Sequence, residues 1–141
     1  MAIKIFLDTN IIIDFFDPTR PEHDSAVAVV AAIENEKFEA YLSESVLNTS
    51  AYILRKQYTV DSLKEMLSHL LIFTKIISCN NTLYKKGLQL LSNDIEDAIL
   101  YQLAFENNLD YFITSDKKDF KKLSSSSLPV LAAKDLMKIP G

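Results

Sequence analysis

The sequence KIFLDTN, residues 4–10, decides the fold of this chain. Its apolar part, Ile5 to Leu7, indicates a short strand that is buried on both sides, and Asp8 ends that strand. A second apolar run, YFIT at residues 111–114, is followed by the acidic sequence SDKKD at residues 115–119. In an open parallel sheet, ligands bind beyond the carboxyl ends of the strands. We therefore expect the two acidic sequences to lie together at a ligand-binding edge.

Strand and helix patterns alternate along the whole chain. Short apolar runs predict five strands, at residues 3–7, 38–42, 75–78, 111–114 and 129–131. Amphipathic patterns predict the intervening helices, at about residues 10–15, 25–36, 44–57, 59–71, 80–91, 94–107 and 133–137. This alternation indicates parallel βαβ units. The predicted fold class is α/β, with a five-stranded parallel sheet flanked by helices on both faces.

Some predictions concern the ends and faces of these helices. Asp24 or Ser25 is expected to cap the second helix, and Ser43 the third, because their side chains can accept a backbone N–H. The apolar spacing places Ile53, Leu71 and Ile95 among the inward-facing or apolar-stripe residues.

Length and composition indicate a single domain, residues 1–141. Hydrophobic residues make up 48% of the 141, enough for a sizeable core. No segment is long and apolar enough to span a membrane, and the start lacks the layout of a signal peptide. Cys79 is the only cysteine, which excludes an internal disulfide and suits a reducing compartment. We therefore expect a cytoplasmic protein that does not enter a membrane.

The charge of the chain is unevenly distributed. Its formal net charge of −4 differs from the basic balance of a dedicated nucleic-acid binder. Four lysines nevertheless follow Asp116 closely, at positions 117, 118, 121 and 122. They could line the rim of a metal-filled pocket that binds a polyanion, or they could form a solvated helix face. The sequence leaves both interpretations open.

Acidic residues from three distant segments are expected at one edge of the sheet: Asp8, Asp97 and Asp116. Such carboxylates repel one another unless a cation lies between them, and their oxygens suit a hard divalent metal. A metal there would indicate phosphoryl-transfer chemistry. Asp119 lies one turn beyond Asp116, and we expect one of the two to bind metal while the other caps or orients. Thr114 offers a hydroxyl that could hold a carboxylate or a water.

Each of these residues also has a structural alternative. Asp8 could be the N-cap of the helix that follows it. Asp97 comes just after Asn93 and Asp94, either of which could cap the same helix. For Asp94 and Glu96 the capping or surface interpretation is favoured.

Other kinds of site are not supported. The chain has two glycines and neither follows a predicted strand, so it contains no P-loop or dinucleotide fingerprint. The only histidines, His23 and His69, lie away from the strand ends, which argues against a zinc site or an activated nucleophile.

Three motifs resemble those of the PIN-domain family: FLDTNII at residues 6–12, DIEDA at 94–98 and ITSDKKDF at 113–120. They occur in the family's order and spacing and span essentially the whole chain. The resemblance implies a nuclease that cuts RNA with Mg²⁺ or Mn²⁺ held by acids. Matched motif by motif, it implies Asp8, Asp97 and Asp116 as catalytic metal ligands, Asp119 as an auxiliary ligand, and Asn10 as a brace for Asp8.

The resemblance also implies a biological setting. Many stand-alone prokaryotic members are toxins of VapC-type toxin–antitoxin pairs, so an antitoxin protein in a separate chain is expected. The apolar helix faces further suggest a homodimer.

One position departs from the family pattern. The family usually carries a glutamate on the helix after the second strand, about six residues beyond the serine that ends the strand. Counted from Ser43, that position is Thr49. Glu44 lies five residues earlier, about 140° round the helix, so it cannot simply replace the missing acid. We therefore expect weaker metal binding, or a single bound metal.

These sequence features leave three functional hypotheses to compare. The leading hypothesis is a metal-dependent ribonuclease that acts as a toxin. The second is a PIN-like module that binds RNA or a protein without cleaving, which Thr49 motivates. The third is a phosphatase of the haloacid-dehalogenase kind with Asp8 as nucleophile. That chemistry needs an acid two residues later, where this chain has Asn10.

Overall fold

The computed structural model describes residues 2–140 and contains one sheet of parallel strands. The strand order is β3-β2-β1-β4-β5. The strands are β1 (Ile3–Leu7), β2 (Phe38–Leu42), β3 (Thr74–Ile76), β4 (Tyr111–Ile113) and β5 (Val130–Leu131). All four neighbouring pairs are parallel. The predicted α/β fold with a five-stranded parallel sheet is confirmed.

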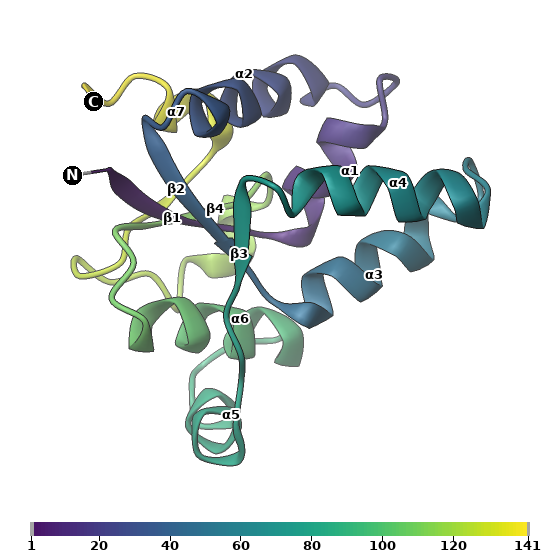
Figure 1. The fold of residues 1–141 in the computed structure, drawn as a ribbon. Helices are drawn as coiled ribbons and strands as arrows, with labels where there is room; N and C mark the ends of the chain where they lie inside the picture. Colours follow the sequence, from purple (N-terminus) through teal and green to yellow (C-terminus); the bar gives the residue numbers. More distant parts are fainter. Residues whose placement is uncertain (1, 141) are drawn as a thin grey trace.

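Helices flank both faces of this sheet. In Figure 1, α2 and α7 lie above it and α5 and α6 lie below it. Helix α1 packs against α2 and α3, and α3 packs against α4. The bounds are α1 (Thr9–Phe16), α2 (His23–Glu34), α3 (Glu44–Leu54), α4 (Val60–Leu70), α5 (Asn81–Leu88), α6 (Ile95–Glu106) and α7 (Ala133–Leu136). None of the helices in residues 2–140 combines the length and the hydrophobicity needed to cross a membrane.

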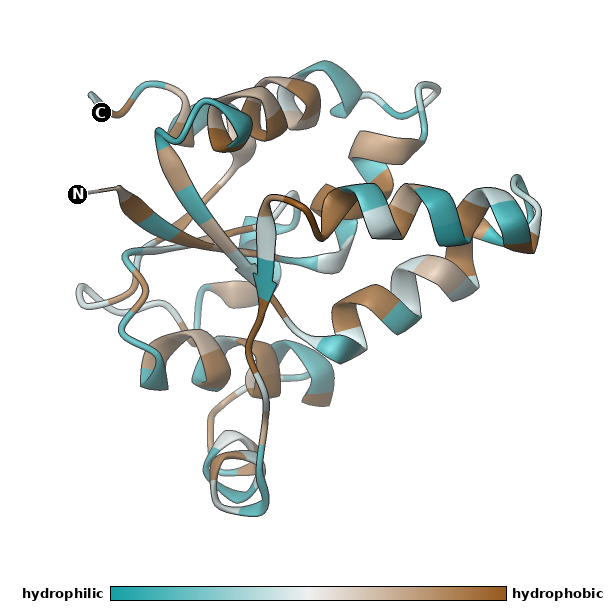
Figure 2. Cartoon of the chain, in the orientation of Figure 1, coloured by the Kyte–Doolittle hydropathy of each residue, from teal (hydrophilic) through white to brown (hydrophobic). Residues whose placement is uncertain are grey.

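A cluster of phenylalanines anchors the centre of the sheet to the turn that follows β4. Phe6 and Phe112 are register partners on β1 and β4, and their rings stack with centroids 5.2 Å apart. Phe120 packs on Phe112 at 4.7 Å. It ends the 3-10 turn η1 (Lys117–Phe120) and is almost fully buried. Figure 2 shows hydrophobic and hydrophilic residues alternating along β2, and hydrophobic residues on the helices around the sheet. Burial of Phe120 therefore positions the acidic turn before it.

The sheet's hydrogen bonding continues past the ends of its central strands. The Asp8 N–H donates to the Ile113 carbonyl at 3.0 Å, and the Thr114 N–H donates to the Leu131 carbonyl at 3.0 Å. Asp8 and Thr114 therefore leave the sheet at the same edge, as parallel pairing requires.

Two predictions about helix ends have different outcomes. Ser43 caps α3 as predicted, and its Oγ accepts the Val46 N–H at 3.2 Å. The prediction for α2 is wrong: Glu22 is its N-cap, without a side-chain capping bond, so neither Asp24 nor Ser25 has that role. Arg20 and His23 contact Asp14 of α1, and α2 begins at His23, one residue before Asp24.

Three apolar side chains predicted to face inward are exposed instead. The exposed fraction is 44% for Ile53, 39% for Leu71 and 63% for Ile95. Ile95 is the first residue of α6, and Leu71 follows the last residue of α4. Residues at helix ends can continue an apolar stripe beyond the area that neighbouring elements cover. Ile53 lies near the end of α3 and borders the cavity described next.

Candidate active site

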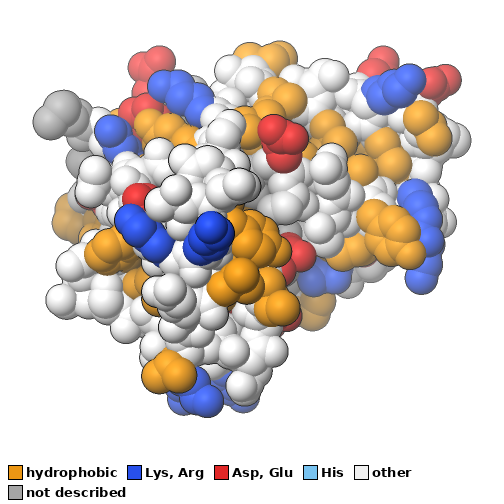
Figure 3. Space-filling view, turned by 90° about the horizontal axis from the view of Figure 1, so that it is seen from below, with side chains coloured by type: hydrophobic (Ala, Val, Ile, Leu, Met, Phe, Trp, Pro, Cys, Tyr) orange, Lys and Arg blue, Asp and Glu red, His pale blue; other side chains and the backbone are white. Residues whose placement is uncertain are grey.

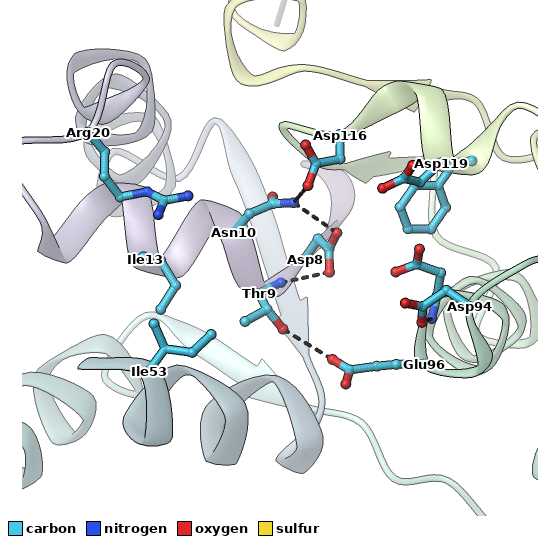
Figure 4. A pocket seen from close by; sticks show the side chains of 12 residues that line it. Asp8, Thr9, Asn10, Ile13, Arg20, Ile53, Asp94, Glu96, Asp116 and Asp119 are labelled. Carbon is cyan, nitrogen blue, oxygen red and sulfur yellow. Dashed lines mark hydrogen bonds between the residues drawn. The ribbon is translucent and has the colours of Figure 1, made fainter. Parts of the chain in front are cut away.

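A cavity of about 290 Å³ lies at the carboxyl ends of β1 and β4 (Figure 4). Side chains from the exit of β1, from α1, from the start of α6 and from η1 line it. Six of the lining side chains are carboxylates: Asp8, Asp94, Glu96, Asp97, Asp116 and Asp119. The structure thus brings together all four acids proposed from the sequence as metal ligands.

Asp8 is the most enclosed of these acids, with 5% of its surface exposed. Its Oδ1 accepts the Thr9 N–H at 2.7 Å, so Asp8 is also the N-cap of α1. Its Oδ2 accepts the Thr114 hydroxyl at 2.8 Å. Burial raises the pKa of Asp8 to about 6, with smaller contributions from the charges of Glu96 and Asp116. The capping role and a place in the acidic site therefore coexist in one residue.

Asn10 ties the exits of the two central strands together. Its Nδ2 lies 3.3 Å from Asp8 Oδ2, 3.1 Å from Thr114 Oγ1 and 3.1 Å from Asp116 Oδ2. Its Oδ1 accepts the backbone N–H of Ser115 at 2.9 Å. Figure 4 shows the amide between the two carboxylates. Asn10 thus sets the spacing between Asp8 and Asp116.

The start of α6 supplies three acids to the cavity. Asp94 is the N-cap, and its Oδ1 accepts the Asp97 N–H at 3.0 Å, which confirms the capping role predicted for it. The pKa of Asp97 is raised to about 7, first by burial and then by the nearby charges of Asp94, Asp8, Asp119 and Glu96. In residues 2–140, no lysine, arginine or histidine forms an ion pair with Asp97. Negative charge here is concentrated and uncompensated.

Glu96 borders the cavity and is exposed, which agrees with the surface position that the sequence favoured for it. The Thr9 hydroxyl donates to Glu96 Oε1 at 3.5 Å, across from the exit of β1 (Figure 4). Burial raises the pKa of Glu96, and the neighbouring Asp94 adds to the effect. Its position in the first turn of the same helix as Asp97 was the available sequence signal.

The acids after β4 sit at the opposite side of the cavity. The Asp116 N–H donates to Thr114 Oγ1 at 3.1 Å, and the Asp119 N–H donates to the Asp116 carbonyl at 3.0 Å. Asp116 precedes η1 but makes no side-chain capping bond. Its carboxylate is held by Asn10 instead.

The remaining wall of the cavity is partly apolar and carries one positive charge. Ile13 of α1 and Ile53 of α3 face each other there, with Arg20 above them (Figure 4). Helix α3 therefore reaches the cavity through Ile53 and not through Thr49. The sequence did not indicate Arg20 or Ile53 as residues of this site.

The carboxylates face one cavity without being drawn together. Among residues 2–140, no three acidic, histidine or cysteine side chains are already grouped closely enough to hold a metal ion. The donor set itself is composed of hard oxygen atoms, which are the ligands that Mg²⁺ and Mn²⁺ prefer. The buried Asp8 and the half-buried Asp97, which repel each other, would both be stabilised in their charged forms by a cation between them. The residues present therefore fit a divalent metal, provided that side chains move inward to reach it.

Comparison with known sequences identifies the family. A family model described as a PIN domain matches residues 4–118. The chain belongs to the PIN domain family. The PIN domain described here is similar to Ribonuclease VapC1 of Aquifex aeolicus (strain VF5), with 27% identity over 122 residues, 81% of this chain and 82% of that protein. The resemblance inferred from the three motifs is confirmed.

Solved structures with the same fold include two toxin-related proteins. VapBC2 from Rickettsia felis, solved with a DNA fragment from its promoter, matches this PIN domain with a TM-score of 0.70 and 19% identity. That match covers 92% of this chain and 98% of the other. VapC20 of Mycobacterium tuberculosis, described as a toxin that cleaves the sarcin-ricin loop, matches with a TM-score of 0.63 and 13% identity over 77% and 86% of the two chains. These likenesses concern the fold.

Proposed function

We propose that this PIN domain is a metal-dependent endoribonuclease that hydrolyses RNA phosphodiesters, and that it is the toxin of a toxin–antitoxin pair. One observation carries the proposal: six carboxylates line a single cavity at the sheet edge where α/β proteins bind ligands. Membership of the PIN family and the similarity to Ribonuclease VapC1 support the same reaction. We further propose that residues 1–141 form one PIN-like domain, because β5 belongs to the same sheet as β1.

Asp8, Asp97 and Asp116 would hold Mg²⁺ or Mn²⁺, and Asp119 would assist. When bound, the cation supplies charge neutralisation at the phosphate and lowers the pKa of an attacking water. The protein's own residues prepare the site. The Thr9 N–H and the Thr114 hydroxyl fix the two oxygens of Asp8, and Asn10 holds Asp116 at its distance from Asp8. We also assign Glu96 to the donor set, because its carboxylate faces the exit of β1.

We propose two protein partners in addition to RNA. A separate antitoxin chain would neutralise the enzyme, which the likeness to VapC-type proteins supports. A second copy of the chain would form a homodimer. Figure 3 shows hydrophobic side chains gathered on the face seen from below, over α5 and α6, where exposed apolar residues include Tyr84, Leu88, Leu91 and Ile95. The cytoplasm, where the RNA substrates occur, is the proposed location.

The test is a cleavage assay with purified protein, using total RNA and transfer RNA. Parallel reactions contain Mn²⁺, Mg²⁺ or a chelator, and each is repeated with Asp8→Asn. We expect discrete cleavage products only when both the metal and Asp8 are present. Cleavage by a folded Asp8→Asn protein at the wild-type rate would show that the site is wrongly assigned.

One observation favours a second candidate, a PIN-fold module that binds RNA or a protein without cleaving. Helix α3 presents Ile53 to the cavity, and the acid that the family usually carries on this helix is replaced by Thr49. Stoichiometric RNA binding by folded, antitoxin-free protein, without turnover in either metal, would support this candidate over the nuclease.

A further inference from the structure

Arg20 is the one basic side chain among the residues that line the acidic cavity in the described part of the chain. It belongs to the loop between α1 and α2, and its guanidinium points across the cavity rim toward Asn10 (Figure 4). Its Nε donates to Asp14 Oδ1 at 2.6 Å. The Arg20 side chain is 40% exposed, whereas the Asp14 side chain is 3% exposed. A buried carboxylate thus holds an arginine whose outer end faces solvent.

Asp14 connects this arginine to the acidic site. Its Oδ2 accepts the Ser115 hydroxyl at 2.7 Å, so both of its oxygens have partners. The backbone N–H of Ser115 donates to Asn10 Oδ1 at 2.9 Å. Asn10 in turn contacts Asp8 and Asp116. The chain of contacts from Arg20 through Asp14 and Ser115 therefore sets the position of the guanidinium relative to the proposed metal ligands.

The guanidinium retains most of its hydrogen-bonding capacity. Only Nε takes part in a hydrogen bond with another described residue, which leaves the N–H groups of Nη1 and Nη2 available at the rim. Arginine presents these donors as a planar fork that matches the oxygens of a phosphate. The Asp14 contact also holds the side chain in one orientation before a ligand arrives.

An RNA backbone needs positive charge at this rim. Six carboxylates line the cavity, and even after metal binding they would repel the phosphates beside the reacting one. Among the described residues no lysine lines this cavity, and Lys117, the nearest in sequence to Asp116, borders a neighbouring cavity beside Asp135. Arg20 has the charge, the position and the available donors.

We propose that Arg20 binds a backbone phosphate of the RNA substrate next to the scissile one, and that Asp14 is the positioning residue for it. This inference rests on the proposed ribonuclease function and names the contact by which that site holds its substrate. The competing explanation is that Arg20 serves only to neutralise the buried Asp14 and so to hold the loop between α1 and α2.

The experiment measures RNA binding separately from cleavage. Asp8→Asn protein, expected not to cleave, is titrated with a fluorescently labelled single-stranded RNA of mixed sequence in Mg²⁺, at several salt concentrations. Arg20→Gln should weaken binding by roughly tenfold, as loss of a charged hydrogen bond does. The slope of log Kd against log salt should fall by about 0.7, the value for one phosphate contact on a single strand. The chain's other arginine provides the matched control, and Arg55→Gln on the exposed end of α3 should leave both quantities unchanged.

A double variant separates the two explanations. Arg20→Gln alone leaves Asp14 buried without its cation, so it could weaken binding through the fold. Asp14→Asn combined with Arg20→Gln removes the unpaired charge and should restore the unfolding midpoint. If Arg20 binds phosphate, the double variant still binds RNA weakly, with the smaller salt slope. Restored RNA binding in the double variant, or an unchanged Kd and slope in Arg20→Gln, would overturn the proposal.

RNA cleavage by protein that retains Asp8 tests the proposed function separately from the phosphate contact. A wild-type protein that binds RNA through Arg20 but never cleaves would refute the nuclease and leave the phosphate contact supported. Normal cleavage by the Arg20→Gln variant, with an unchanged KM, would refute the phosphate contact and leave the nuclease intact. If the protein both cleaves RNA and binds phosphate through Arg20, we expect Arg20→Gln to raise KM more than it lowers kcat.

Discussion

Replacing Asp8 by asparagine should stabilise the metal-free protein while removing its activity. The pKa of Asp8 is raised from 3.8 to about 6, so the folded protein holds this proton more tightly than the unfolded chain. The contribution of Asp8 to stability is therefore fully present below pH 3.8 and is lost as the pH rises through about 6. At about 1.4 kcal/mol per pH unit, the raised pKa of Asp8 destabilises the fold by about 3 kcal/mol at pH 7.5 and by about 1 kcal/mol at pH 4.5, relative to low pH.

Asparagine has nearly the same shape and cannot ionise. Its side-chain oxygen can accept the Thr9 N–H, but its amide group replaces the oxygen that accepts the Thr114 hydroxyl and the Asn10 amide, and this loss offsets part of the gain. In a chelator, we expect Asp8→Asn to exceed the wild type in free energy of unfolding by as much as about 3 kcal/mol at pH 7.5, with a much smaller difference at pH 4.5.

The assay is urea unfolding followed by circular dichroism, with and without Mg²⁺. Adding Mg²⁺ should stabilise the wild type and have little effect on the variant, since ligand binding adds stability only to the form that binds. An Asp8→Asn protein that is no more stable than the wild type at pH 7.5 in chelator would refute the argument that burial of an unpaired carboxylate strains this site.

Three other changes test different parts of the same edge. Glu96→Gln should weaken Mn²⁺ binding by about tenfold in calorimetric titration, because a donor is lost. The control Glu44→Gln, on the exposed start of α3, should leave the affinity unchanged. Equal Mn²⁺ affinities for Glu96→Gln and the wild type would remove Glu96 from the donor set. Asn10→Ala removes the link between Asp8 and Asp116 and should lower the free energy of unfolding by about 1–2 kcal/mol and slow cleavage, measured by urea unfolding and by the RNA assay. Phe120→Ala should lower the free energy of unfolding by about 3–5 kcal/mol, seen as an earlier thermal transition, and a change under 1 kcal/mol would contradict the anchoring role given to this ring.

The sheet could be predicted from the sequence where short runs are mostly apolar. The observed bounds of β1 and β2 are those expected: β1 is buried from Ile5 to Leu7, and β2 alternates buried and half-buried residues. The third strand was placed one residue too late and extended too far. It is observed as Thr74–Ile76, an edge strand with Lys75 and Ile76 exposed, so its position follows from pairing with β2 more than from its own composition.

The acidic edge could be predicted for a related reason. Asp8 and Asp116 follow strands, and parallel strands end at a common edge, so topology alone brings them together. The side chains that come from helix orientation and from loops could not be found this way. Glu96 borders the cavity from the first turn of α6, and Arg20 reaches the rim from a loop that is held to Asp14. The contact between Arg20 and Asp14 has no spacing in the sequence that would reveal its place beside the cavity.

Helix α3 carries Thr49 where the family usually has a glutamate. From the sequence alone, this residue predicts one negative ligand fewer and a lower metal affinity. In the structure, α3 faces the cavity with Ile53, while the first turn of α6 supplies Asp94, Glu96 and Asp97. The positive end of a helix stabilises negative charge in its first turn, so α6 can carry this concentration of acids better than the middle of α3 could. The first turn of α6 therefore supplies three carboxylates to the cavity although α3 supplies none, and the absence of a glutamate at position 49 is a weaker argument against catalysis than the sequence alone suggested.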